Sequence, residues 1–426
     1  MELLPSSRPV RRRRFAVPAV VLLALAAARG AAAQEVRPPA GEISVLQKME
    51  QQFTPEAARA GSGVIQPAGT LDLSYDSNVL ARPHVGDDFA ASVEPALEVR
   101  SGWTNHALGL KAQGEARQYA VHTSENQMNG SVAANGRADL APNAYVVGNA
   151  AVQRLHEDRG ALVAAEGIRP TPVTVAGGAG GIVIEPSPMG FRLDGAIDAY
   201  SFDNVTGTLA PINESWRDRV VYSLVPRITY AVIPQYDAFV RAVINRRDYE
   251  HANLTPDGIK RDSTGVGGDV GLAIDVPGLA VGEFYLGYLR QDYDRQGLRP
   301  IEAVDFGANL MWSPAGATTV RFNVSRSVEE SALPGLHGYL QTSVRLALEQ
   351  ELMRDLVALG SAAFIRADFA PGNAGTNIYE FSIGARHFLG NGLTVGLEYL
   401  LRHRDKMAFL PAYTRQIVGL RLRSQW

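Results

Sequence analysis

The sequence predicts an all-β protein that folds as a transmembrane, antiparallel, up-and-down β-barrel of about 18 strands, with a range of about 16–18. Three observations predict this fold. About eighteen segments between Leu71 and Trp426 alternate apolar with polar residues. The connections between them are in turn long and short, which is typical of outer-membrane barrels with short periplasmic turns and long extracellular loops. The last segment ends in an aromatic residue, Trp426.

Residues 1–33 have the features of a secretory signal peptide. Four consecutive arginines, residues 11–14, precede an apolar stretch over residues 15–28 that is too short to cross a bilayer as a helix. The sequence Ala31-Ala32-Ala33 then offers a cleavage site. The alternative is a buried N-terminal helix, which fits the adjacent arginines poorly. We therefore predict an exported chain whose mature part begins near Gln34.

Residues 34–67 differ from the rest of the chain and predict a periplasmic N-terminal extension. Ile43, Leu46, Met49 and Phe53 have the spacing of one helical face, and Ser44 is a suitable N-cap. We expect one short amphipathic helix here. A linker, a plug and a docking element all fit this pattern.

The predicted barrel covers residues 68–426. Its strands place apolar side chains on one face and polar or charged side chains on the other, as where Leu71 and Leu73 alternate with Asp72. Because lipid offers no partner to a backbone N–H, such strands must close into a ring. The strand over residues 172–184 is the least regular, because it is glycine-rich from Gly177 to Gly181.

The connections predict the topology. Short turns containing proline, glycine or asparagine are expected near residues 101–106, 139–144, 185–190, 233–236, 276–280, 313–317, 350–355 and 388–392. Long loops are expected near residues 76–88, 119–126, 155–171, 200–216, 246–264, 290–302, 325–338, 367–377 and 402–414. An even number of strands places both ends of the barrel on the periplasmic side.

Composition narrows the function classes. The chain has no cysteine, so an exported fold must be held by something other than disulfides, and a closed barrel satisfies this. The formal net charge is −3, and residues 1–33 contribute six arginines and one glutamate, so the mature chain is more acidic still. An acidic chain is not an obvious partner of nucleic acid.

Tryptophans are placed as in the aromatic girdles of a membrane barrel. Trp103 and Trp312 lie beside short turns, Trp426 ends the chain on the same side, and Trp216 lies beside a long loop. We predict that all four are membrane-interface aromatics. The alternative is that they are scattered core aromatics of a soluble β protein.

The last strand carries a second signal. Val418, Leu420 and Leu422 alternate with polar residues before Trp426, and this pattern resembles the C-terminal signature that the outer-membrane barrel assembly machinery recognises. Ser424 departs from it, because a tyrosine or an apolar residue is usual there. The resemblance implies the assembly machinery as a partner.

A wider resemblance starts at Leu71-Asp72-Leu73-Ser74-Tyr75-Asp76-Ser77-Asn78-Val79. This opening, the N-terminal extension and the chain length resemble the putative β-barrel porin 2 family over roughly residues 65–426. The family consists of outer-membrane barrels of Gram-negative bacteria. Some members are associated with exopolysaccharide export, so the resemblance implies a polysaccharide and its export proteins as partners.

The face opposite the apolar residues supplies the predicted lumen-lining charges. The first seven strands contribute mainly acidic candidates: Asp72, Glu94, Glu98, Glu115, Asp194 and Asp198. The later strands contribute mainly basic ones: Arg219, Arg227, Arg241, Arg247, Arg321, Arg345, Arg386, Arg402, Arg421 and Arg423. One hypothesis is a transverse field that orients polar or anionic saccharides. The alternative is that these charges pair across neighbouring strands and keep the lumen hydrated.

No catalytic motif accompanies the barrel pattern. The sequence contains no Gly-x-Ser-x-Gly elbow, no His-Glu-x-x-His motif and no phosphate-binding glycine loop, so we expect no cofactor and no metal site. The predicted function is a porin-like channel for polar solutes or for exopolysaccharide export. A plugged or structural barrel whose loops bind partners or surface matrix is the alternative, and an outer-membrane hydrolase is a third class. Outer-membrane lipid and lipopolysaccharide are expected to surround the barrel.

Overall fold

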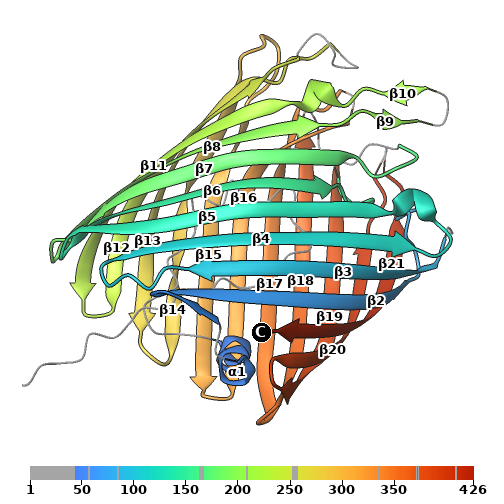
Figure 1. The fold of residues 1–426 in the computed structure, drawn as a ribbon. Coiled ribbons are helices and arrows are strands. Elements are labelled where there is room, and N and C mark those ends of the chain that lie inside the picture. Colours follow the sequence, from blue (N-terminus) through green and yellow to red (C-terminus); the bar gives the residue numbers. More distant parts are fainter. Residues whose placement is uncertain are drawn as a thin grey trace, which may run out of the picture.

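The computed structural model describes residues 44–55, 58–83, 86–162, 167–207, 210–251, 258–333, 335–370, 372, 374–407 and 410–426. The predicted signal peptide, residues 1–33, lies outside the described residues. Most of the described chain is β-strand (Figure 1).

The strands form one closed antiparallel barrel, as the sequence predicted. The 19-stranded sheet consists of the short strand β1 and a ring of eighteen strands, in which neighbours in sequence are neighbours in the ring. β2 and β21 pair with each other and close it. The ring strands are β2 (Gly63–Asp76), β3 (Asp88–Arg100), β4 (His106–Tyr119), β5 (Gln127–Ala141), β6 (Ala144–His156), β7 (Pro172–Ile184), β8 (Met189–Phe202), β11 (Arg219–Ile233), β12 (Tyr236–Tyr249), β13 (Ser263–Val276), β14 (Ala280–Tyr293), β15 (Ile301–Ala315), β16 (Thr318–Glu330), β17 (Gly338–Met353), β18 (Leu356–Ala370), β19 (Gly375–Gly390), β20 (Leu393–Arg404) and β21 (Tyr413–Gln425).

Short and long connections alternate around the ring, as predicted. The turn between β19 and β20 shows why its residues suit a tight reversal: Gly390, Asn391 and Gly392 all have positive φ, a conformation that glycine and asparagine tolerate best. The long connections at the other end carry four small elements. These are η2 (Thr123–Glu125), β9 (Val205–Thr206), β10 (Pro211–Ile212) and η3 (Ser215–Arg217).

Two glycines of β7 are required by the side chains of the neighbouring strand. A side chain at Gly177 or at Gly181 would collide with the Asp198 or Asp194 carboxylate of the neighbouring strand β8. The glycines therefore leave room for two aspartates on the same face of the wall, and β7 pairs with β6 and β8 along its whole length.

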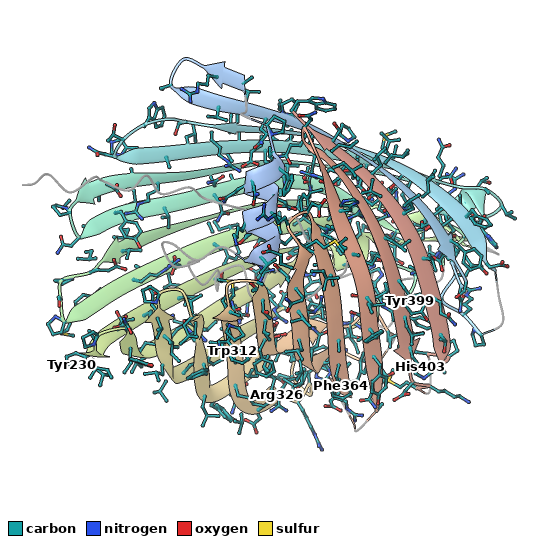
Figure 2. All side chains as sticks on the ribbon, turned by 90° about the horizontal axis from the view of Figure 1, so that it is seen from below. Tyr230, Trp312, Arg326, Phe364, Tyr399 and His403 are labelled. Atoms are coloured by element: carbon teal, nitrogen blue, oxygen red, sulfur yellow. The ribbon has the colours of Figure 1, made fainter. Side chains whose placement is uncertain are left out.

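The two faces of the wall differ as the alternation predicted. On β11, Tyr222, Leu224 and Ile228 are exposed, whereas the intervening Val225 is buried. Figure 2 shows the labelled Tyr230, Trp312, Phe364 and Tyr399 on the outer side of the ring. The apolar face therefore points outward and the polar face points into the lumen. Among the described residues, no helix is long and apolar enough to cross a membrane.

The predicted N-terminal helix is present as α1 (Val45–Phe53), and Ser44 caps it. Ser44 and Gln47 form a reciprocal capping box, which satisfies two N–H groups at the helix start. β1 (Ala58–Ala60) follows and pairs with the start of β2. Because β2 begins at Gly63, the first residues of the barrel wall belong to the segment predicted as the extension.

Candidate functional site in the barrel lumen

The candidate lumen charges lie on the face opposite the exposed apolar side chains. On β2, Asp72 lies between Leu71 and Leu73, which are 40% and 47% exposed. On β12, Arg241 is almost completely buried next to Val240, which is 59% exposed. The same alternation holds along β3, β4, β8, β16, β17, β19, β20 and β21. The structure therefore gathers these charges around one enclosed space.

Most acidic candidates of the first strands have a local arginine partner. Arg421 Nε lies 3.2 Å from Asp72 Oδ2 across the closing pair of strands β21 and β2. Ion pairs along single strands join Glu98 to Arg100, Glu115 to Arg117 and Asp194 to Arg192. Glu94 receives a long hydrogen bond from Ser92 Oγ, and Asp198 faces Gly177.

The basic candidates of β11 and β12 belong to a packed layer on the inner wall. Arg227 Nη1 lies 2.6 Å from Glu283 Oε2, and Arg241 Nη2 lies 2.8 Å from Asp269 Oδ2. Arg227 also stacks over the Phe239 ring, with Cζ 3.8 Å from its centroid. Arg241 is almost completely buried between charges and aromatic rings, whereas the Arg227 side chain is 18% exposed.

Five further basic candidates are also placed in local contacts. Arg247 pairs with Glu330, Arg321 with Glu349, and Arg345 and Arg402 share Glu380. Arg219 stacks over the Tyr200 ring at 4.3 Å. This local pairing favours the second interpretation of the charge pattern, in which the charges neutralise one another; a transverse field stays a prediction.

The segment between β6 and β7, of which the structure describes residues 157–162 and 167–171, crosses the outer part of the lumen. Asp158 of this segment reaches β20 and β21, where its carboxylate lies 3.4 Å from Arg402 Nη1 and 3.3 Å from Arg415 Nη1. Arg415 in turn lies 2.6 Å from Asp76 Oδ2, and Arg402 lies 2.7 Å from Glu380 Oε1. Three carboxylates and two arginines therefore anchor the segment to β20 and β21, which are several strands away around the ring.

Further contacts hold the crossing segment on both sides. Arg217 of η3 donates to Glu157 Oε2 at 3.0 Å, and Arg159 donates to Glu125 Oε2 at 2.8 Å. Leu162 packs in an apolar cluster with wall and loop side chains. This cluster contains Leu162, Leu336, Tyr339, Ala367, Phe369, Ile378 and Met407. The segment therefore narrows the lumen as a fixed part of the structure.

The charge of Asp158 is strongly favoured. Burial by itself raises the pKa of its carboxyl, but the charges of Arg415 and Arg402 and a hydrogen bond from Gly160 N–H outweigh burial and lower that pKa to about 2. A carboxylate held between two guanidinium groups keeps its charge over the physiological pH range.

We expect the channel conductance to stay constant from neutral pH down to about pH 4 and to rise only as the pH falls towards 2. The pKa of Asp158 is lower in the folded state than the unfolded value of about 3.9. Its contribution to docking is therefore complete above the unfolded value and is lost as the pH falls through the folded one. Single-channel recording across this range measures the effect, and Asp158→Asn should abolish the acid step. A step near pH 6 that survives in Asp158→Asn would contradict this assignment.

The other end of the lumen holds α1. Figure 2 shows this helix inside the ring of strands. Val45 and Met49 are buried against Val357 and Phe388 of the inner wall, and the Phe53 and Phe388 rings stack 5.5 Å apart. At the helix start, Leu46 N–H donates to Glu349 Oε2 at 2.9 Å. The positive end of the helix dipole also stabilises a carboxylate at this position.

An arginine patch, formed by Arg386, Arg421 and Arg423, lies beside α1 on β19 and β21. Gly396 of the intervening strand β20 pairs in register with Arg386 on one side and with Arg421 on the other. Arg386 Nη1 lies 3.4 Å from Glu50 of the helix. Arg423 has no ion-pair partner among the described residues, so the patch carries more positive than negative charge.

Three of the four predicted interface tryptophans are exposed. Trp103, Trp312 and Trp426 lie at the short-turn end, and Val418, Leu420 and Leu422 of the C-terminal pattern are exposed on the outer face of β21. Trp216 differs from its prediction. It is 4% exposed, because it lies within η3 with the Arg261 guanidinium 5.0 Å from its ring centre. The structure therefore places Trp216 inside an outer loop and not at the membrane interface.

The sequence reasoning missed Asp158, Arg415 and Asp76, which anchor the crossing segment. Asp158 lies in a loop, where a hydrated charge is the default expectation, and its partners are far away in sequence. The one available signal was the charge run Glu157-Asp158-Arg159 in a long loop. Among the described residues, no three histidine, aspartate or glutamate side chains are placed to hold a metal ion.

Comparison with known proteins adds one strong match. A family model described as putative beta-barrel porin 2 matches residues 51–426. No curated protein is significantly similar. Two similar solved structures are OpdK from Pseudomonas aeruginosa, at 15% identity and a TM-score of 0.44, and OccAB4 from Acinetobacter baumannii, at 11% and 0.46. These matches cover 85% of this chain and 99% and 98% of the other chains. Such values are too low to transfer a substrate to this chain.

Proposed function

This chain belongs to the putative beta-barrel porin 2 family, and from this premise and the lumen geometry we propose that it is a non-catalytic outer-membrane channel for small polar solutes. The observation that carries the proposal is the inner wall itself. Most of its charged side chains are paired locally and face an enclosed space, while apolar side chains face outward. Such a wall keeps the lumen hydrated without a catalytic group.

The size of the solute is limited at both ends of the lumen. The crossing segment narrows the outer part, and α1 occupies part of the other end. Small solutes fit these restrictions better than a polymer. Liposome swelling is the direct test: reconstituted protein should admit a monosaccharide such as glucose and exclude a tetrasaccharide such as stachyose. No swelling with any sugar would overturn the channel and favour the plugged or structural barrel.

Exopolysaccharide export is the second candidate function, and it rests on the family resemblance. For a polysaccharide strand to pass, α1 has to leave the lumen, because a helix with its side chains is about 10–12 Å wide. An export role therefore includes a partner that displaces the helix. Export by the wild-type protein, but not by a variant in which α1 is cross-linked to the wall, would support this role.

The arginine patch should give the channel a preference for anions. We expect Arg386→Gln, Arg421→Gln and Arg423→Gln together to lower the anion-to-cation permeability ratio by about two-fold, because they remove the excess positive charge beside α1. Reversal potentials in a salt gradient measure the ratio. Arg366→Gln is the matched control, since Arg366 lies on the outer face of β18 and pairs with Asp368. An unchanged ratio in the triple variant would contradict the role of the patch.

The outer face of the barrel carries charged side chains at its long-loop end. Arg246 and Arg290 lie on the outer face at the long-loop end, where lipopolysaccharide phosphates are expected. Arg246 pairs with Asp248 and Asp294, and Arg290 pairs with Asp292. We propose lipopolysaccharide at this rim, the signal peptide as the route of export, and the assembly machinery as the partner that inserts the last strand.

A further inference from the structure

The pairing between β15 and β16 differs from that of the other neighbouring strands. The two strands pair from Trp312 with Val320 to Ala308 with Val324, together with one pair at the turn. Beyond this point no pairing joins residues 301–307 to residues 325–330, all of which the structure describes. These residues pair normally with β14 and β17 on their other sides. The wall therefore has a seam without a backbone ladder over its outer half.

The strand ends at this seam overlap. Val328 and Leu340 lie on the outward face of β16 and β17, in phase with Phe322 and Leu346, which are exposed. Val328 and Leu340 are nevertheless buried, in a cluster with Tyr293 and Ile301 from the inward face of β14 and β15. The outer ends of β16 and β17 therefore lie on the lumen side of β14 and β15.

Contacts deeper in the lumen agree with this overlap. Glu330 lies on the outward face of β16, yet it pairs with Arg247 and accepts a hydrogen bond from Tyr249 Oη, both on the inward face of β12. The tips of β16 and β17 therefore turn into the lumen behind at least three strands of the wall.

Two arginines bond to backbone carbonyls at the unpaired strand edges. Arg326 Nη1 donates to the Val304 carbonyl of β15 at 2.9 Å, and Arg247 Nη2 donates to the Val328 carbonyl of β16 at 2.7 Å. Figure 2 shows Arg326 on the outer side of the barrel. Its Nε has no hydrogen-bond partner among the described residues. The seam is therefore held by side chains, so its opening breaks no strand pairing.

Membrane lipid is the natural competitor for such a seam. In water, exposing Val328, Leu340 and Ile301 would be strongly unfavourable, because it creates apolar surface. In a bilayer, an acyl chain is as apolar as these side chains and replaces their contacts with little loss. At the free strand edges the two arginines satisfy the Val304 and Val328 carbonyls. The apolar cluster at the seam therefore fits an extended hydrocarbon chain better than a polar solute.

We propose that the outer half of the β15–β16 seam is a lateral slot in the barrel wall that admits the acyl chain of a membrane amphiphile. The chain enters between the outward face of β16 and β17 and the inward face of β14 and β15. Arg326 acts as a clamp on the outer side of this slot. The proposed slot depends on the arrangement of the barrel wall and not on the passage of solutes, so it can be tested without measuring conductance.

Photolabelling of the reconstituted full chain tests the slot. Palmitate carrying a diazirine on its chain should label Val328 and Leu340, as well as the exposed Phe322 and Leu346 on the same strands. A disulfide between Ile301→Cys and Gly338→Cys should lower the labelling of Val328 and Leu340 by about ten-fold, and reduction should restore it. A Cβ at position 338 lies 3.1 Å from Ile301 Cδ1, so the two positions are neighbours, but the Tyr293 hydroxyl has to move aside to make room for it. The chain has no other cysteine.

Controls keep the outcome decisive. A disulfide between Ala308→Cys and Val324→Cys joins the paired half of the same strands and should leave the labelling unchanged. Should the first disulfide variant not fold, Arg326→Gln removes the clamp and should increase labelling at Val328. A phospholipid with the same diazirine chain distinguishes bilayer lipid from a free amphiphile, and labelling by either supports the slot. Absence of label at Val328 and Leu340, or labelling that neither variant changes, overturns it.

Discussion

Replacing Val45 and Met49 of α1 by aspartate should raise the single-channel conductance at least about two-fold, because the helix then leaves the lumen and frees a cross-section about 10–12 Å wide. Both side chains are almost completely buried against Val357 and Phe388. A carboxylate cannot be accommodated in this apolar contact without a large penalty. Planar-bilayer recording of the purified protein measures the change.

The helix also supplies a matched control. Gln51 and Gln52 lie on the exposed side of α1, so replacing both by aspartate adds the same charge without disturbing the contact with the wall. This variant should conduct as the wild type does. Equal conductance in all three proteins would mean that α1 does not obstruct the pore and would remove it from the proposed size limit.

The barrel could be predicted because its physical cause is local. Alternation with period two decides which residues face lipid, and turn residues such as Gly390-Asn391-Gly392 mark the reversals. Even the irregular strand β7 has its predicted bounds. Its glycines do not interrupt the strand, because they leave room for the Asp194 and Asp198 side chains of the next strand. Sequence alone could not supply this reason, since it depends on which side chains lie opposite.

The position of α1 could not be predicted from its amphipathic pattern. Ser44 and the spacing of Leu46, Met49 and Phe53 are sufficient to predict the helix and its start. An apolar helix face, however, fits any apolar surface equally well. Its placement in the lumen depends on Glu349 and Arg386, which lie about 300 residues further along the chain.

The sequence was sufficient to predict which charged side chains face the lumen, but not which of them form ion pairs. Alternation places Arg227 and Arg241 on the inner side, whereas their partners Glu283 and Asp269 are set by strand register. The overlap at the β15–β16 seam has a similar origin. The pattern of β16 continues unbroken to Glu330, so the sequence shows no sign that its end turns inward.

Arg415→Gln should lower the free energy of unfolding by about 3–5 kcal/mol, because it leaves two carboxylates without their shared buried partner. Arg415 is almost completely buried and joins Asp76 on β2 to Asp158 of the crossing segment. The substitution therefore weakens both the closure of the ring and the anchor of the segment. Urea unfolding, followed by the heat-modifiable gel mobility of the barrel, measures the stability, and conductance fluctuations report the freed segment.

Arg421→Gln separates this effect from a general loss of charge between the same two strands. Arg421 pairs with Asp72 across β21 and β2, but its side chain is 35% exposed to the lumen. Exposed ion pairs contribute about 0–1 kcal/mol, so its unfolding midpoint should stay close to that of the wild type. Strand pair, residue type and substitution are identical, so the two variants differ in the burial of the arginine and in its bond to the crossing segment. Equal destabilisation by both substitutions would show that the loss of stability comes from weaker closure of the ring and not from loss of the buried anchor. Another contact would then have to hold the crossing segment in the lumen.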